Sequence, residues 1–444
     1  MILNRILVGR SAVDTARREV SQSIVETVRE ILEGVRDTED RRACVTSYAR
    51  KFDAREAGKF ELFVAAEELE QARVEPRHHD AIREAIRRVR VFHEAQLAAL
   101  TAGMRRRASV YEWSIPAGVT GSIGYAGQRL GPVRYAGVYV PGGKAIYPSS
   151  VIMNAVPAMV AGVERVVIAT PAQADGSLHA AVLVAARELG ISKIVKAGGA
   201  YGIGALAFGF GPAIPPCDVV AGPGNVYVNE AKRQLWGQVG TDLYAGPSEV
   251  AVYVDKTTDL TFAAADLLTQ VEHAEDNVAY LVSSDRSVLD RALVEVEKQL
   301  KGAPREAIMR LALSTCGVGV VVGSEEEAAE VINEIAPEHL SLLGGDPEGM
   351  SDLITNAGAI LIGPYSAQSA GDFGAGPSHT LPTGRAARFA GPVNVLTFMK
   401  LSSISHLQAA DLMELLPTIE AFGEMEGFSA HARGAAIRFV DRGS

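Results

Sequence analysis

Val133-Arg-Tyr-Ala-Gly-Val-Tyr-Val140, followed by Pro141-Gly-Gly143, is the stretch that decides the fold. It is short, rich in β-branched and aromatic residues, and stops at a turn, which is typical of a buried strand. A helix, a strand, a helix and a strand are predicted after it, at 150–160, 166–170, 179–189 and 194–197. This alternation predicts βαβ crossovers in a parallel sheet, whose ligand sites lie at the carboxyl ends of the strands.

The alternation restarts at Val250–Val254 and continues to Ala359–Ile362. We therefore expect an α/β protein with two incomplete Rossmann-like parallel-sheet domains. The first hundred residues have helical periodicity, and Gly34 is a plausible helix stop. The tail after Pro392 shows no comparable strands and is predicted to be helical around Leu412 and between residues 418 and 439.

Composition narrows the class of protein. The chain has 444 residues, of which 48% are hydrophobic and 22% charged, as in globular proteins of two or three domains. Its net charge of −10 argues against a nucleic-acid partner. The sequence has no signal-peptide pattern and no run of about 18 apolar residues without charge, Pro or Gly. The three cysteines are far apart, which fits a reducing compartment, so we expect a cytoplasmic protein with no membrane partner.

Glu338 and His339 stand side by side in Ala336-Pro-Glu-His-Leu340. Adjacent side chains on a regular element point in different directions, so we expect this pair to serve two atoms of one substrate rather than to form a simple ion pair. An imidazole suits proton abstraction near neutral pH, and a carboxylate can polarise a water. Spacing alone leaves a surface role open.

Several other polar residues are candidates for a ligand or metal site. Gln270 and His273 share a helix face at i and i+3, and Asp372 and His379 lie in a glycine-rich loop. Glu426 and His431 lie in the C-terminal segment, where five helical residues would turn them about 140° apart. Gln270, His273, Asp372 and His431 together would make a mixed nitrogen and oxygen shell suited to Zn²⁺, although spacing cannot show that they meet.

The turn Gly222-Pro-Gly-Asn225 joins a predicted strand to a helix. Its glycines let the backbone approach a ligand, and Asn225 can hydrogen-bond a ribose or a phosphate. A plain strand-to-helix turn explains the pattern equally well.

These motifs resemble those of histidinol dehydrogenases, and the resemblance covers essentially the whole chain. The matching blocks occur in the order Tyr139-Val-Pro-Gly-Gly143, Gly222-Pro-Gly-Asn225, Glu230-Ala-Lys-Arg-Gln234, Ala245-Gly-Pro-Ser-Glu249, Gln270-x-Glu-His273, Ala336-Pro-Glu-His-Leu340 and Leu381-Pro-Thr383.

The resemblance implies oxidation of L-histidinol to L-histidine in two NAD-dependent steps through histidinal, the last reaction of histidine biosynthesis. It implies a zinc ion on Gln270, His273, Asp372 and His431, and a homodimer with exchanged segments, so that His431 comes from the partner subunit. The same four ligands, with His339, surround the substrate, and Ser248 and Glu426 match further substrate contacts.

The resemblance also assigns roles in catalysis. His339 would be the base in both oxidations, and Glu338 would activate the water that hydrates the aldehyde. Tyr139 and Asn225 match NAD contacts. At the position of a third NAD contact, Tyr201 stands where the family usually has Gln. The loop Gly209–Pro216 looks longer than usual, and Phe373 stands where Tyr is common.

The expected domain organisation has four parts. Residues 1–34 form an N-terminal helical segment, and 35–137 with 248–390 form a first α/β domain that carries the metal, the substrate and the Glu-His pair. Residues 138–247 form a second α/β domain on the NAD side. Residues 391–444 form a helical tail that reaches the partner subunit in a domain-swapped dimer.

Other functions remain open from the sequence. The nearest is a related enzyme that oxidises another primary alcohol, such as a sulfonated diol; Glu426 would repel a sulfonate and so favours histidinol. A metal-dependent hydrolase would leave the two α/β units unexplained. A binding protein without activity would not need both Glu338 and His339.

Overall fold

The computed structural model describes residues 2–9, 20–117, 124–142, 145–243 and 246–440. The chain divides into a larger unit, Met1–Gln96 with Val133–Phe398, and a smaller unit, Leu97–Pro132 with Met399–Ser444. Gly143 and Ala245, which belong to two of the motifs quoted above, lie outside the described residues, as does part of the predicted N-terminal segment.

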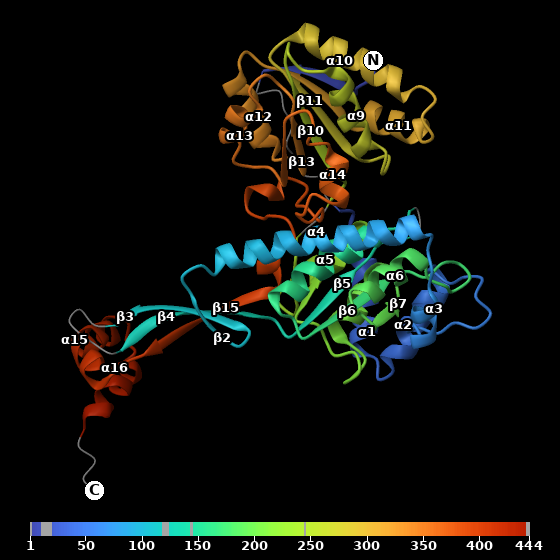
Figure 1. The fold of residues 1–444 in the computed structure, drawn as a ribbon. Helices are drawn as coiled ribbons and strands as arrows, with labels where there is room; N and C mark the ends of the chain where they lie inside the picture. Colours follow the sequence, from blue (N-terminus) through green and yellow to red (C-terminus); the bar gives the residue numbers. More distant parts are fainter. Residues whose placement is uncertain (1, 10–19, 118–123, 143–144, 244–245, 441–444) are drawn as a thin grey trace. The chain divides into compact units, whose positions relative to one another are not determined.

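The first sheet of the larger unit is parallel, with the strand order β1-β12-β11-β10-β13-β14 (Figure 1). In chain order its strands are β1 Arg5–Val8, β10 Glu249–Val254, β11 Val278–Ser283, β12 Gly317–Val321, β13 His339–Leu342 and β14 Ala359–Ile362. The N-terminal strand differs from the helical expectation. Arg5 pairs with Val318, more than 300 positions away, and such a long-range pairing leaves no local signal.

Helices cover both faces of this sheet (Figure 1). On one face are α9 Leu260–Val271, α10 Arg286–Leu300 and α11 Glu306–Cys316, and on the other α12 Glu325–Ile335 and α13 Pro347–Asp352. The short helix α14 Gln368–Phe373 contacts α9. Alternate residues of β10 serve the two layers: Val252 packs with the α9–α11 side, whereas Tyr253 packs with the α12–α13 side. Full burial of such a side chain stabilises the fold by about 1.5–3 kcal/mol.

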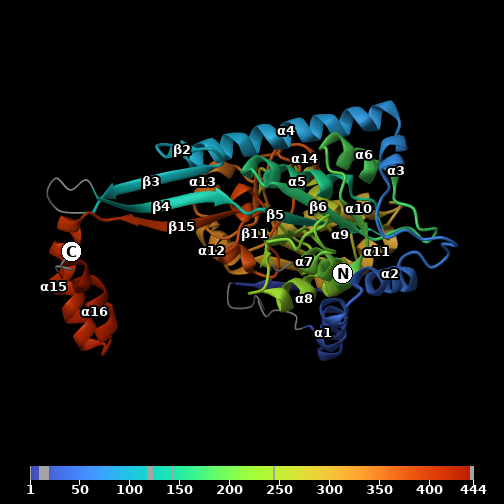
Figure 2. The same cartoon turned by 90° about the horizontal axis from the view of Figure 1, so that it is seen from below.

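The second sheet of the larger unit is also parallel, with the order β7-β6-β5-β8-β9. Its strands are β5 Tyr135–Tyr139, β6 Arg165–Thr170, β7 Ile194–Lys196, β8 Val219–Ala221 and β9 Gly240–Thr241. Helices α5 Pro148–Ala161 and α6 Ala180–Glu188 lie on one side, and α7 Gly199–Phe208 and α8 Val226–Leu235 on the other (Figures 1 and 2). The prediction of two parallel-sheet α/β units is confirmed.

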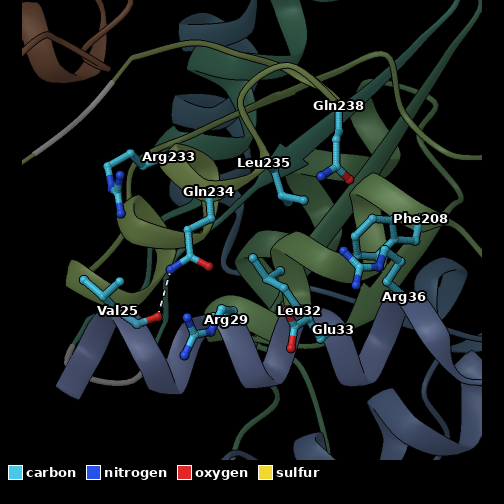
Figure 3. A pocket seen from close by; sticks show the side chains of 10 residues that line it. All are labelled: Val25, Arg29, Leu32, Glu33, Arg36, Phe208, Arg233, Gln234, Leu235 and Gln238. Atoms are coloured by element: carbon cyan, nitrogen blue, oxygen red, sulfur yellow. Dashed lines mark hydrogen bonds between the residues drawn. The ribbon is translucent and has the colours of Figure 1, made fainter. Parts of the chain in front are cut away.

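The N-terminal helices pack beside this second sheet. They are α1 Gln22–Asp37, α2 Arg41–Phe52, α3 Ala66–Gln71 and α4 Pro76–Leu100. Helix α1 contacts α7 and α8, and α2, which the expected boundaries assign to the first α/β domain, contacts α7. A pocket of about 320 Å³ lies between α1 and the end of α8, where Gln234 Nε2 donates to the carbonyl of Val25 at 2.8 Å (Figure 3).

The smaller unit has an antiparallel sheet in the order β15-β4-β3-β2. Its strands are β2 Arg105–Arg107, β3 Val110–Pro116, β4 Tyr125–Pro132 and β15 Met399–His406, followed by α15 Ala409–Met425 and α16 Ser429–Ala436 (Figure 2). The expectation of a tail without strands is wrong, because β15 is mostly exposed and pairs with a distant segment. The predicted tail helices are confirmed, and Gly427, with φ +72°, separates them.

Short 3₁₀ helices complete the fold at Ala386–Arg388, Val395–Phe398 and Ile437–Phe439. No helix in the described ranges is long and apolar enough to cross a membrane.

Candidate active site

Glu338 and His339 lie at the junction of α12 and β13. Helix α12 ends at Ile335 and is capped by Ala336, whose backbone is left-handed with φ +48°. Strand β13 begins at His339, which is paired with Val250 of β10. Glu338 therefore precedes the strand, and the alternation of strand side chains does not apply to the pair. Both residues are buried, and the two side chains approach to 3.8 Å between His339 Nδ1 and Glu338 Oε2, closer than the sequence suggested.

Hydrogen-bond donors surround the Glu338 carboxylate. Its Oε2 accepts from the N–H of Glu249 at 2.9 Å and from Gln270 Nε2 at 3.2 Å, and the Ser248 side chain also bonds the carboxylate. Burial raises the pKa of Glu338 to about 7, against the opposing effect of His339. A carboxyl with a pKa near neutrality can take a proton from water and return it.

His339 lies between two carboxylates. Its Nε2 is 3.6 Å from Asp372 Oδ1, and its Nδ1 has no hydrogen-bond partner among the described residues. Burial by itself would lower the pKa of His339, but the charges of Glu338 and Asp372 outweigh that effect and raise it. Two carboxylates beside the ring stabilise the imidazolium, which is the form that a histidine takes after accepting a proton.

Gln270 lies in the last turn of α9, whereas His273 follows the C-cap residue Glu272, so the two do not share a regular helix face as their spacing suggested. The amide of Gln270 donates to Glu338, while its Oε1 accepts from Gln368 Nε2. Burial lowers the pKa of His273, which favours the neutral imidazole that binds metals. Asp372 lies on α14 and is close enough to both His273 and His339 to affect their pKa values.

His379 lies next to Asp372 in space as well as in sequence. Its Nδ1 is 3.0 Å from the carbonyl oxygen of Asp372, and its Nε2 is 3.4 Å from the hydroxyl of Ser150 on α5. Burial lowers the pKa of His379.

Sequence reasoning missed Glu249 and Gln368. Glu249 follows Ser248, and its Oε1 accepts the N–H of Gly384 at 3.2 Å, whereas its buried Oε2 has no partner in the described part of the chain. Burial, together with the charge of Glu338, raises the pKa of Glu249 to about 8. Its place at the end of a motif block was a usable signal, but nothing in the sequence distinguishes Gln368.

The predicted cofactor residues lie at the carboxyl ends of the second sheet. Tyr139 ends β5, and its hydroxyl accepts the N–H of Gly199 at 3.0 Å. Asn225 caps α8 and remains exposed, with its Oδ1 accepting from the N–H groups of Tyr227 and Val228.

Tyr201 lies on α7 and is only 4% exposed. Its ring stacks with those of Tyr48 and Phe52, and its hydroxyl bonds Asp53. Direct contact with a cofactor would need this ring to leave the stack, so the structure favours an indirect role for Tyr201.

Glu426 and His431 lie in the smaller unit. Glu426 ends α15, His431 lies on α16 next to the ring of Phe428, and both are exposed. Within the described residues, no group of three or more His, Cys, Asp and Glu is arranged to hold a metal. Gln270, His273 and Asp372 belong to the larger unit and are gathered around the Glu-His pair, whereas His431 belongs to the smaller unit.

Two parallel sheets with a buried carboxylate-imidazole pair at a strand end define an α/β enzyme of the acid-base type. The family model for histidinol dehydrogenase matches residues 15–439. The chain belongs to the histidinol dehydrogenase family.

Relatives of this family match nearly the whole chain. Histidinol dehydrogenase of Bacillus licheniformis is 41% identical over 415 residues, covering 93% of both chains. The Bacillus subtilis enzyme is 42% identical over 415 residues, covering 93% of this chain and 92% of its own. The crystal structure of histidinol dehydrogenase from Elizabethkingia anophelis has a TM-score of 0.88 at 31% identity and covers 98% of both chains.

Proposed function

We propose that this protein oxidises L-histidinol to L-histidine through histidinal, as the last step of histidine biosynthesis in the cytoplasm. Two NAD molecules would accept the four electrons, and one zinc ion would be bound per subunit. The observation that carries the proposal is the buried Glu338–His339 pair beside Asp372, because it combines a base and a water-activating carboxyl in one site.

The side chains around the pair fit a divalent ion such as zinc. His273 supplies a neutral imidazole, Asp372 a carboxylate and Gln270 an amide oxygen, which is a donor set that zinc accepts. Gln270 Oε1 accepts from Gln368 here, so that amide would have to give way. His431 of the partner subunit would complete the protein ligands. When bound, the ion would orient the imidazole and amine of histidinol.

His339 would act as the base in both oxidations. It would remove the alcohol proton in the first step and a proton of the aldehyde hydrate in the second. Because Glu338 and Asp372 flank the ring, the charge that the imidazole gains is balanced within the site. NAD would receive the hydride in each step.

Glu338 would activate the water that attacks the aldehyde between the two oxidations. Its pKa of about 7 leaves it able to accept a proton from that water at neutral pH. The donors from Glu249 and Gln270 hold one carboxylate oxygen, Oε2, so the other can face the water.

Tyr139 and Asn225 would contact NAD at the second sheet, and Tyr201 would support the turn at Gly198–Gly199 from behind. Asp53, which bonds the hydroxyl of Tyr201, also accepts the N–H of Gly198 at 3.0 Å. The side chain of Tyr201 thereby reaches the same turn that Tyr139 binds through Gly199.

A homodimer with exchanged segments would bring Glu426 and His431 to a neighbouring site. The smaller unit supports this proposal because large apolar side chains remain exposed on it, and exposed apolar surface of this kind marks an interface. They include Trp113, Ile115, Leu401, Met413, Phe422, Met425 and Phe428.

The test is a stoichiometric assay. Purified protein with zinc, NAD and L-histidinol should form two NADH per histidinol and yield histidine. Absence of NADH would refute the proposal. Faster oxidation of another primary alcohol, such as a sulfonated diol, would reassign the substrate while keeping the chemistry. In that case, substitution of Ser248 or Glu426, the further proposed substrate contacts, should not weaken the binding of histidinol more than that of the other alcohol.

A further inference from the structure

A buried ion pair clamps the first residue of the turn Gly222–Asn225. Lys232 Nζ donates to the carbonyl oxygen of Gly222 at 2.9 Å and lies 2.7 Å from Asp242 Oδ1. The other oxygen, Asp242 Oδ2, accepts the N–H of Gly222 at 2.8 Å. The pair therefore engages both the donor and the acceptor of one backbone residue.

The pair is shielded from solvent, since the side chains of Lys232 and Asp242 are 1% and 0% exposed. Burial of two charges carries a large desolvation cost, so a buried ion pair is a poor way to gain stability alone. It is better explained by the geometry that it enforces. Here that geometry belongs to a glycine in the left-handed region, with φ +127°.

The clamp sets where the turn lies against β5. A Cβ atom on Gly222 would come within 2.1 Å of the carbonyl oxygen of Tyr139, so the turn touches the backbone of a proposed cofactor residue. Asn229 holds the turn again, donating from Nδ2 to the carbonyl of Gly224 at 2.9 Å. A small displacement of Gly222 would thus move the turn relative to Tyr139.

The turn ends at Asn225, whose Oδ1 is occupied by the N–H groups of α8. The Nδ2 donor of this exposed side chain remains for a ligand with acceptor oxygens, such as a ribose or a phosphate. The orientation of that donor depends on the turn that carries it.

We propose that Lys232 and Asp242 are positioning residues for the dinucleotide. Their ion pair holds Gly222 so that Asn225 and Tyr139 have the relative positions needed to contact the cofactor together. This inference rests on the proposed use of NAD. Both side chains are buried, so neither would contact the cofactor itself.

The chain offers a matched control. Lys196, on β7, is also buried, donates to a glycine carbonyl (Gly176, 3.2 Å) and pairs with Glu68 at 2.8 Å. Lys196→Met and Lys232→Met each remove a buried lysine that bonds a glycine carbonyl and a carboxylate, one from β7 and one from α8. Only the second releases the turn Gly222–Asn225.

Affinity for NAD and NADH should fall about tenfold in Lys232→Met, as is common when a residue that holds a ligand-contacting group in place is removed. Calorimetry and NADH fluorescence measure this affinity. The KM for histidinol and the kcat at saturating NAD should stay near their wild-type values. Lys196→Met should keep the wild-type NAD affinity even if its stability falls.

Hydrogen exchange gives a readout that needs no activity. Without cofactor, the peptide covering Gly222–Asn225 should exchange faster in Lys232→Met than in the wild type. In Lys196→Met it should exchange at the wild-type rate. If Lys232→Met does not fold, Asp242→Asn replaces it, because it keeps an acceptor for the N–H of Gly222 and removes the charge.

Wild-type NAD affinity in the folded Lys232 or Asp242 variant would overturn this inference while leaving the proposed function intact. A wild-type protein that does not reduce NAD with histidinol would overturn the proposed function itself.

Discussion

His339 Nε2 lies 3.6 Å from Asp372 Oδ1, so the proposed base and a proposed zinc ligand face each other inside one buried site. The carboxylate of Asp372 can therefore hold the imidazole in place as well as bind a metal. On the other side of the ring, Glu338 is held by the main chain of Glu249 and by Gln270. We therefore expect substitutions of Glu338 and Asp372 to affect different functions, namely the use of water and the binding of zinc.

Glu338→Gln should slow the oxidation of histidinal much more than the oxidation of histidinol. The amide keeps an oxygen that can accept from Glu249 and Gln270, so the site should remain folded, but it cannot take a proton from water. The measurement is the rate of NADH formation with each of the two substrates. Equal losses with both substrates would contradict the separation of roles between Glu338 and His339.

Asp372→Asn should weaken zinc binding by at least about tenfold, because a charged ligand is replaced by a neutral one. Zinc retained after dialysis against a chelator, measured by atomic absorption, reports this directly. Ser369→Ala is a suitable control, since Ser369 lies exposed on the same helix, α14. Full zinc retention in Asp372→Asn would remove this residue from the proposed shell.

Local patterns predicted most of the fold, because hydrophobic runs in the sequence identify buried parallel strands and the helices that cover them. The helix at 150–160 and the strand at Val250–Val254 appear almost as predicted. Strand β1 and the antiparallel sheet of the smaller unit were not predicted. Strand β1 depends on a partner far away in the chain, and β15 of that sheet is mostly exposed and pairs with the distant β4.

The candidate site was predicted through motifs, and the supporting residues were not. Gln270, His273 and Asp372 gather around Glu338 and His339, but the contact of Gln368 with Gln270 depends on how α14 packs against α9. The burial of Tyr201 also could not be predicted, because it comes from the packing of α2 against α7.

Glu249→Gln should flatten the dependence of stability on pH. The pKa of Glu249 is about 8 in the folded state and near 4.5 when exposed, so the folded protein binds more protons between these values. The free energy of unfolding should therefore fall as pH rises from about 4.5 to 8, the direction required by linkage.

Urea denaturation across that pH range measures the effect. The variant should be less sensitive to pH than the wild type, and more stable relative to it at pH 8 than at pH 5. A wild-type stability that rises steadily over this range, with the same slope in the variant, would show that Glu249 is ionised in the folded protein at neutral pH.

Tyr201→Phe should lower stability by about 1–3 kcal/mol, because Asp53 loses the hydrogen bond from the hydroxyl while the ring stays in the stack. NAD affinity should fall less than it does in Asn225→Ala, at an exposed position, because Asp53 keeps its bond to the N–H of Gly198. Denaturation curves and NADH fluorescence titrations separate the two effects. A stable Tyr201→Phe variant that loses as much NAD affinity as Asn225→Ala would make Tyr201 a direct contact.

Mixed dimers should show whether the tail of one subunit serves the site of the other. His431→Ala and Asp372→Asn should each be inactive as homodimers, because each removes one proposed zinc ligand. If His431 is supplied by the partner subunit, a heterodimer of the two variants has one damaged site and one intact site. Co-expression with two different tags, followed by sequential purification, isolates that heterodimer, which should recover activity.

A heterodimer of His431→Ala with Glu426→Ala is the matched control. Both changes lie on the tail, so each of its sites receives a damaged tail and activity should stay low. If each tail served its own subunit, the His431→Ala and Asp372→Asn heterodimer would contain two damaged sites. An inactive heterodimer would therefore show that His431 serves the site of its own chain, and exchanged segments would not be needed.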